Sequence, residues 1–152
     1  MGRHSGFEAF EEETPEDIAQ NAAREAVVML EAKDTPAGMM DVIMQNGWGG
    51  VLVHEAVGHP LEADNIAKKT GAFTGKLGQK VATDVFTMVD DGSLPNFRGT
   101  VNFDDEGTQM KRNVLIEKGV LKKYMTDILS AKQLGMERTG NGRRESFRYM
   151  PG

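Results

Sequence analysis

Two of the three histidines in this 152-residue chain flank a glutamate within one short stretch. His54 and Glu55 are adjacent, and His59 follows five residues after His54, which gives the pattern H-E-x-x-x-H. Neutral imidazole nitrogens are ordinary zinc ligands, and a carboxylate beside them could accept a proton from an attacking water molecule. The pattern therefore indicates a hydrolytic zinc site in which His54 and His59 bind the metal and Glu55 is the general base. The alternative is that both histidines are surface or packing residues.

The five-residue spacing sets a condition on the backbone. In the ordinary metallopeptidase pattern H-E-x-x-H, four residues place the two imidazoles about 40° apart around an α-helix, whereas five residues place them about 140° apart. A regular α-helix would point His54 and His59 away from each other. A π-type turn, with hydrogen bonds between residues five apart, would bring them to one side. Since Gly58 and Pro60 bracket His59, the sequence predicts such a distortion in the last turn.

A zinc site of this kind needs a third protein ligand. The candidates in this chain are Glu62, Asp64 and the distant His4, and spacing alone selects none of them. The absence of cysteine excludes a thiolate ligand, a thiol nucleophile, an iron–sulfur cluster and a disulfide framework within these residues.

Composition narrows the class of protein. Hydrophobic residues make up 39% and charged residues 27% of the chain, which suits one soluble domain with a core of its own. We expect neither a membrane span nor a secretory signal, because apolar runs are short, and a cytoplasmic location follows as an expectation. The net charge of −5 argues against direct nucleic-acid binding, which requires neutralisation of phosphates.

The elements that would position the motif are predicted from hydrophobic spacing and from turn residues. Thr14-Pro15 begins a helix whose apolar residues recur up to Leu30, and a second helix, Trp48–His59, carries the motif. The expected strands are Met39–Gln45, Val81–Val89, Thr100–Phe103, and a hairpin of Asn113–Glu117 with Val120–Met125, before a short helix over Thr126–Leu134. The fold class is therefore α+β: two helices with a short strand, followed by a mostly antiparallel strand and hairpin region and a short helix.

Two further groups of residues could do chemistry. Asp90-Asp91 and Asp104-Asp105-Glu106 are acidic clusters that could bind a divalent cation, although turn chemistry explains them more simply. The glycine-rich segment Thr139–Arg144 could grip a substrate carboxylate through its arginines, or it could be a flexible loop. The Val81–Val89 strand could offer an edge to an extended peptide, although an internal paired strand is the simpler interpretation.

The motif and its surroundings resemble a known family. The stretch Gly50–Asp64, with the sequence GVLVHEAVGHPLEAD, is followed in order by Val89–Pro95, Asp104–Thr108 and Thr139–Ser146. Together these segments resemble the TldD/PmbA family of metallopeptidases, whose members have been called modulators of DNA gyrase. The glycine-flanked histidines resemble the TldD-type subunit, because the PmbA-type (TldE) partner generally lacks them.

The resemblance implies a zinc peptidase that acts on unfolded or extended peptides, often beside a PmbA/TldE-like sibling. It implies His54 and His59 as metal ligands, Glu55 as catalytic base, and a third ligand that is a cysteine near the family's C-terminus. Family chains are considerably longer, so the resemblance predicts an internal fragment. Residues 1–64 would end the N-terminal domain, with the motif helix, and residues 65–152 would begin a β-rich C-terminal domain. The alternative function is a non-catalytic module that pairs with the sibling subunit or with a second copy.

Overall fold

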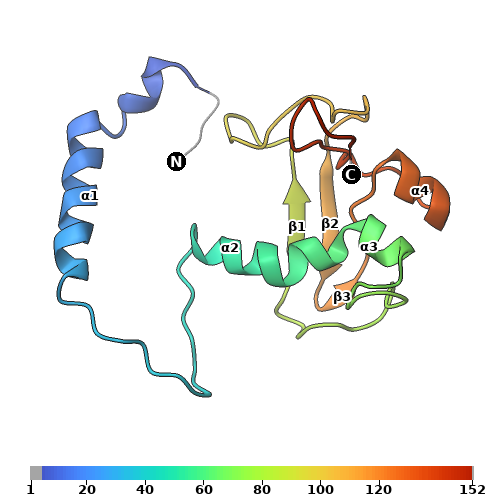
Figure 1. Ribbon diagram of the computed structural model, residues 1–152, viewed down its shortest axis with the longest axis horizontal. Coiled ribbons are helices and arrows are strands. Elements are labelled where there is room, and N and C mark those ends of the chain that lie inside the picture. Colours follow the sequence, from blue (N-terminus) through green and yellow to red (C-terminus); the bar gives the residue numbers. More distant parts are fainter. Residues whose placement is uncertain (1–4, 152) are drawn as a thin grey trace. The chain divides into compact units, whose positions relative to one another are not determined.

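The computed structural model describes residues 5–151, and these form two compact units. One unit comprises residues 5–44 and 96–98, with a 3₁₀ turn at Phe7–Phe10 and helix α1 (Pro15–Met29) (Figure 1). The other comprises residues 45–95 and 99–151 and contains the histidine motif. The assignment of residues 1–64 and 65–152 to two domains of a longer protein stays a prediction. Within the described residues, no helix has the length and apolar character needed to cross a membrane.

Helix α1 begins where the sequence predicts. Thr14 and Asp17 form a reciprocal capping box, in which the Thr14 hydroxyl accepts from the Asp17 backbone N–H and the Asp17 carboxylate accepts from the Thr14 N–H. Pro15 occupies the first helical position, where no backbone donor is needed. None of the residues of α1 is buried, and Val27 and Leu30 are 64% and 85% exposed.

The second unit is built on a three-stranded antiparallel sheet. Its order is β1 (Met88–Asp91), β2 (Arg112–Glu117) and β3 (Val120–Leu121), so β1 is an edge strand among the described residues. Lys118 and Gly119 join β2 to β3 with φ angles of 47° and 77°, which is the left-handed turn geometry of a tight hairpin. The predicted hairpin is confirmed, although β3 ends earlier than expected.

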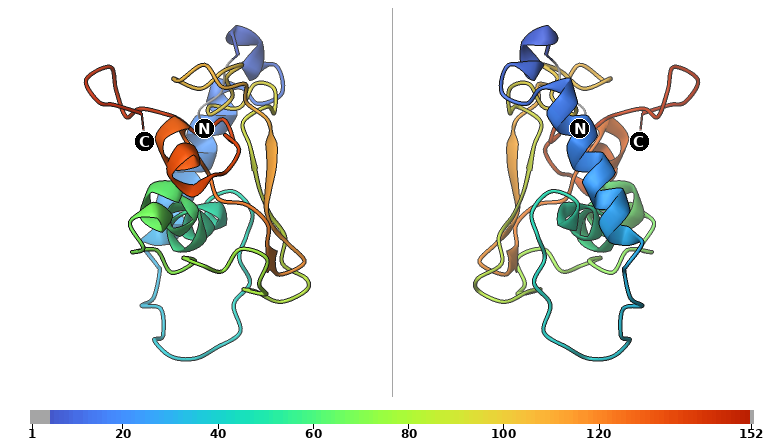
Figure 2. Two further views of the ribbon diagram at one scale, coloured as in Figure 1. Left: turned by 90° about the vertical axis from the view of Figure 1, so that its right-hand side faces the viewer. Right: turned by 90° about the vertical axis from the view of Figure 1, so that its left-hand side faces the viewer.

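The helices of this unit lie on one side of the sheet (Figure 2). They are α2 (Gly49–Val53), α3 (Ala63–Ala67) and α4 (Ile128–Leu134). The core between helices and sheet consists of seven buried residues: Leu61, Ala63, Ile66, Leu115, Ile116, Leu121 and Tyr124. The α+β class is therefore confirmed, and the first three core residues directly follow the histidine motif in the chain.

Two predicted strands form only in small part, and in the first of them the backbone groups bond elsewhere. Within Val81–Val89, only the last two residues belong to β1; the N–H of Val81 donates to the carbonyl of Gly119, and the N–H of Gly119 donates to the carbonyl of Phe86. The alternating residues thus wrap the β2–β3 turn instead of extending the ladder. Thr100–Phe103 forms one isolated bridge, between Phe103 and Gln109.

The predicted strand at Met39–Gln45 is also wrong. This segment has no regular secondary structure, and Val42 and Ile43 are 72% and 100% exposed. A strand requires a hydrogen-bonded partner, and the described residues supply none beside it. The apolar residues of this segment are therefore exposed on the surface and do not belong to a sheet.

Helix α4 confirms the predicted short helix, with a start two residues later. Asp127 caps it through a capping box with Ser130, and Gly135 ends it in the left-handed conformation at φ 65°. Helix α3 was not expected, because residues 60–80 have a loop-like composition.

We predict that Asp127→Ala lowers the free energy of unfolding of the chain by about 1 kcal/mol near pH 7, because the Ser130 backbone N–H loses its acceptor. Burial raises the pKa of Asp127, but the hydrogen bonds donated by Ser130 hold that pKa below its ordinary value overall. The contribution of the charged carboxylate is therefore fully present above the unfolded-state pKa of about 3.9, and it is lost as pH falls through the lower folded-state pKa.

Urea unfolding of both proteins at pH 7 and at about pH 3 measures this effect, and the difference should narrow at the lower pH, where the carboxylate becomes protonated. Gln133→Ala, at an exposed position of the same helix, should stay within about 0.5 kcal/mol of the wild-type chain. An equal loss in Gln133→Ala, or a difference that stays constant with pH, would contradict the capping role.

Candidate metal centre

The backbone changes its helical period at the histidine motif. Residues His54–Gly58 form a π-helical turn directly after α2, and the backbone N–H of His59 donates to the carbonyl of His54, five residues earlier. A 3₁₀ turn at His59–Leu61 follows, with Pro60 near its start. The π-type distortion that the five-residue spacing requires is thus confirmed.

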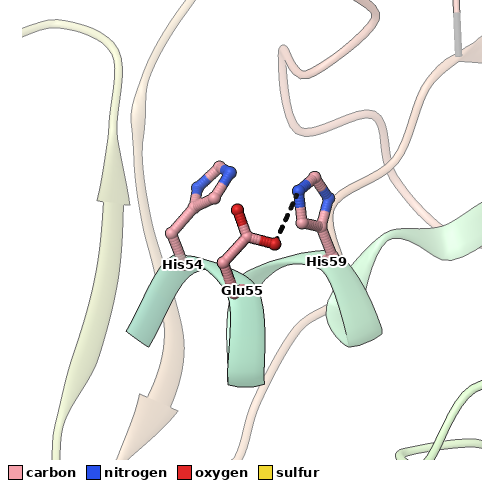
Figure 3. A group of neighbouring side chains, drawn as sticks. All are labelled: His54, Glu55 and His59. Atoms are coloured by element: carbon pink, nitrogen blue, oxygen red, sulfur yellow. Dashed lines mark ion pairs between the residues drawn. The ribbon is translucent and has the colours of Figure 1, made fainter. Parts of the chain in front are cut away.

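The turn brings the two imidazoles together. The ring centroids of His54 and His59 are 4.5 Å apart, at an interplanar angle of 72°. One potential ligand atom from each of His54, Glu55 and His59 lies within 4.8 Å of the others, and Figure 3 shows the three side chains on the same side of the helix. Among the described residues this is the one group of three or more histidine or acidic side chains close enough to share a metal ion.

Two carboxylates flank the ring of His59. Its Nε2 lies 3.8 Å from Oε2 of Glu55, and its Nδ1 lies 2.8 Å from Oε1 of Glu62. The hydrogen bond with Glu62, together with the charges of Glu62 and Glu55, holds the pKa of His59 above its ordinary value. Nδ1 is therefore engaged by Glu62, while Nε2 faces the side on which Glu55 lies.

The core fixes the end of the motif. Leu61 is fully buried and Ala63 is 1% exposed. Between them, the N–H of Ala63 donates to the carbonyl of Met125 and the N–H of Met125 donates to the carbonyl of Leu61, at 2.8 and 3.0 Å. On the other side, a side chain built at buried Gly58 would contact the His54 ring and the methyl group of Met88 in β1. The π-turn is thus held between the sheet and the Met125 segment.

The structure places neither Glu62 nor Asp64, the described candidates for a third ligand, in the group formed by the motif side chains. Asp64 forms an ion pair with Lys68 at 2.8 Å. His4 lies outside the described residues. The interaction of Glu62 with His59 was missed at the level of sequence, where Glu62 counted only as a metal ligand; its position three residues after His59, next to a helix start, is the signal that could have found it.

The acidic clusters hold the glycine-rich segment Thr139–Arg144. Oδ2 of Asp90 accepts from the side-chain amide of Asn141 at 2.9 Å, and Oδ2 of Asp104 accepts from the N–H of Gly142 at 3.0 Å. Oδ2 of Asp105 accepts from the N–H of Arg144 at 2.8 Å, and this bond holds the pKa of Asp105 below its ordinary value. These contacts favour a structural role for the clusters over a cation site.

The same segment also reaches the neighbourhood of the motif. Asn141 and Arg143 line a cavity of about 160 Å³ whose wall includes Glu62 and Asp64. Arg143 contacts Asp105 through Nε at 3.4 Å, and its terminal nitrogens have no hydrogen-bond partner within residues 5–151. The cavity links the glycine-rich segment to the carboxylate that contacts His59.

The donor set fits zinc. Two exposed imidazoles converge on one side of a helix, and nitrogen is a ligand that zinc accepts readily. The two histidines leave coordination positions to be filled by a third protein ligand and by water or substrate, as catalytic zinc sites require.

Comparison with known proteins decides the family. The family model of the PmbA/TldA metallopeptidase C-terminal domain matches residues 37–152. The chain belongs to the TldD/PmbA family of metallopeptidases. It is 46% identical over 155 aligned residues to a metalloprotease TldD homolog of Haemophilus influenzae, an alignment that covers 99% of this chain and 32% of the relative. It is 33% identical over 135 residues to a zinc metalloprotease TldD homolog of Saccharolobus solfataricus, which covers 86% of this chain and 29% of that protein.

Solved structures support the same family. A proposed modulator of a DNA gyrase from Thermotoga maritima matches with a TM-score of 0.73 and 31% identity, over 91% of this chain and 33% of that one. TldE from Thermococcus kodakarensis matches with a TM-score of 0.56 and 35% identity, over 62% of this chain and 21% of that one. The chain thus spans about a third of the length of the curated relatives it matches.

Proposed function

We propose that this chain carries the zinc-binding and proton-transfer residues of a metallopeptidase that cleaves unfolded or extended peptides. The observation that carries the proposal is the π-turn, which gathers His54, Glu55 and His59 within 4.8 Å on one side of a helix. The names of the relatives support peptidase chemistry, and that of the Saccharolobus solfataricus protein supports zinc.

Each residue of the motif has a distinct task in this proposal. His54 and His59 hold the zinc ion through ring nitrogens, with Nε2 of His59 free because Nδ1 contacts Glu62. When bound, zinc acts as a Lewis acid and allows water to attack a peptide carbonyl near neutral pH. Glu55, 3.8 Å from Nε2 of His59, accepts the proton of the attacking water and passes it to the leaving amine.

The surroundings of the motif favour an extended substrate. The side chains of His54, Glu55 and His59 are exposed, so a peptide can approach them without a deep pocket. Strand β1 lies against the π-turn through Met88, and among the described residues it pairs only with β2. The other edge of β1 therefore presents backbone groups to which an extended peptide can bind as an added strand.

The remaining parts of the proposal concern what lies around this chain. We place the third zinc ligand in the part of the relatives' length that this chain does not span, where the family resemblance implies a cysteine. We also propose a cytoplasmic location. We propose neither a nucleic acid nor a membrane as a direct partner, and the net charge of −5 disfavours binding to nucleic-acid phosphates.

The first prediction from this proposal is zinc binding by the chain itself. His54→Ala and His59→Ala should each weaken zinc binding, measured by calorimetry, by more than the about 10- to 100-fold that loss of an outer-shell partner costs. The matched control is His4→Ala, which removes the third histidine of the chain. Unchanged zinc binding in His54→Ala or in His59→Ala would show that the motif is not the zinc site, whereas a loss in His4→Ala would make His4 the third ligand.

The second prediction concerns the base. In a chimera in which this chain replaces the aligned third of the Haemophilus influenzae relative, Glu55→Gln should lower kcat for an unfolded peptide by about 100-fold or more, because the amide cannot accept the proton. Zinc content should stay at the level of the unmutated chimera. Glu31→Gln, at an exposed glutamate outside the motif, serves as control. Turnover that Glu55→Gln leaves intact would remove Glu55 from the mechanism.

A second candidate function, an assembly module, is favoured by exposed apolar residues at the C-terminal end of α1, where Val27 and Leu30, three residues apart, share one face. Val27, Val28, Met29 and Leu30 are each at least 64% exposed, which is unusual for adjacent large apolar residues on a helix. A PmbA/TldE-like sibling subunit or a second copy of the chain would bury this face. Assembly and catalysis do not exclude each other.

For the assembly function, we predict that the purified chain self-associates in analytical ultracentrifugation. The double variant Val27→Lys with Leu30→Lys should shift it towards monomer, because two buried charges would cost more than the contact gains. Glu16→Lys with Gln20→Lys, in the first half of the same helix, is the control and should leave the distribution unchanged. A monomeric wild-type chain would contradict self-association through this face.

A further inference from the structure

The carboxylate of Glu62 contacts the motif without belonging to it. Oε1 of Glu62 lies 2.8 Å from Nδ1 of His59, and both side chains are only partly covered, with exposed fractions of 44% and 48%. We propose that Glu62 is a positioning residue, which holds the ring of His59 in one tautomer and one orientation so that Nε2 stays free. The part of this inference that concerns metal binding rests on the proposed function.

The chemistry of the ring makes the contact directional. A neutral imidazole carries one N–H and one lone pair, and an ionised carboxylate can only accept a hydrogen bond. The contact with Glu62 therefore requires the proton to be on Nδ1, and the lone pair is left on Nε2. Nε2 is the atom that faces Glu55, at 3.8 Å, on the side where the motif side chains gather. Glu62 thus selects the tautomer that presents a ligand atom at the proposed centre.

The backbone of Glu62 is placed firmly enough to do this. Its two neighbours, Leu61 and Ala63, are buried in the core, and both are hydrogen-bonded to the backbone of Met125. Glu62 itself forms an isolated parallel bridge with Met125 and has extended backbone geometry, with ψ at 128°. A carboxylate on such a fixed backbone orients the ring without the loss of backbone entropy that ordering a mobile loop would require.

The two histidines differ in this respect. Among the described residues, no comparable hydrogen bond fixes the ring of His54. A loss of Glu62 should therefore change His59 and leave His54 as it is. This asymmetry separates positioning by Glu62 from a general effect of charge or of folding, which would act on both rings.

The test begins with the chain free of metal. Two-dimensional ¹H–¹⁵N spectra of the imidazole rings, recorded at alkaline pH where the rings are neutral, report which nitrogen carries the proton. We expect Nδ1–H for His59 in the wild-type chain, a shift towards Nε2–H in Glu62→Ala, and an intermediate result in Glu62→Gln, whose amide oxygen still accepts a hydrogen bond. The tautomer of His54 should not change.

The second arm uses zinc alone. Glu62→Ala should weaken zinc binding by about 10- to 100-fold, the range typical of the loss of a carboxylate that orients a histidine ligand, and Glu62→Gln should recover part of that loss. Asp64→Ala is the matched control, because it removes an equal charge two residues away that pairs with Lys68. Circular dichroism of each variant checks the fold.

The outcomes separate this inference from the proposed function. An unchanged tautomer of His59 in Glu62→Ala overturns the positioning role, whatever happens to zinc. An Asp64→Ala variant that weakens zinc binding as much as Glu62→Ala also overturns it, since charge alone would then be the cause. If the wild-type chain binds no zinc while Glu62→Ala still shifts the tautomer, the positioning role stands and the proposed metal centre in this chain fails.

Discussion

One backbone hydrogen bond governs the arrangement of the site. The N–H of His59 bonds to the carbonyl of His54, five residues back, where an α-helix would join residues four apart. Because of that extra residue, two imidazoles that would otherwise diverge have ring centroids only 4.5 Å apart. Every chemical role assigned to the motif depends on this local departure from α-helical geometry.

The rest of the second unit stabilises the departure. Leu61, two residues after the motif, is buried in the core, and backbone hydrogen bonds join Leu61 and Ala63 to Met125. The acidic clusters at residues 90–91 and 104–106 hold the glycine-rich segment, and Asn141 and Arg143 of that segment reach the cavity beside Glu62. The fold thus brings residues that are far apart in sequence to the end of a short irregular helix, where the bonds with Met125 hold the backbone.

Sequence reasoning succeeds here where local chemistry determines structure. The helix start at Thr14-Pro15, the Lys118-Gly119 turn and the π-turn all follow from residue types within a few positions of each other. It fails where a distant partner decides. The alternation in Val81–Val89 is typical of a strand, but the Gly119 turn takes up the backbone groups of Val81 and Phe86. Likewise, the carboxylate of Glu62 is of a type that binds metals, and only the fold shows that it contacts Nδ1 of His59 instead.

X-ray absorption spectroscopy of the zinc-loaded chain tests the central claim most directly, because it counts the imidazoles on the ion. The account predicts two histidine ligands on each zinc ion, at the usual zinc–nitrogen distance of about 2.0–2.1 Å. One imidazole per zinc ion, or none, would show that the π-turn does not make His54 and His59 a shared site.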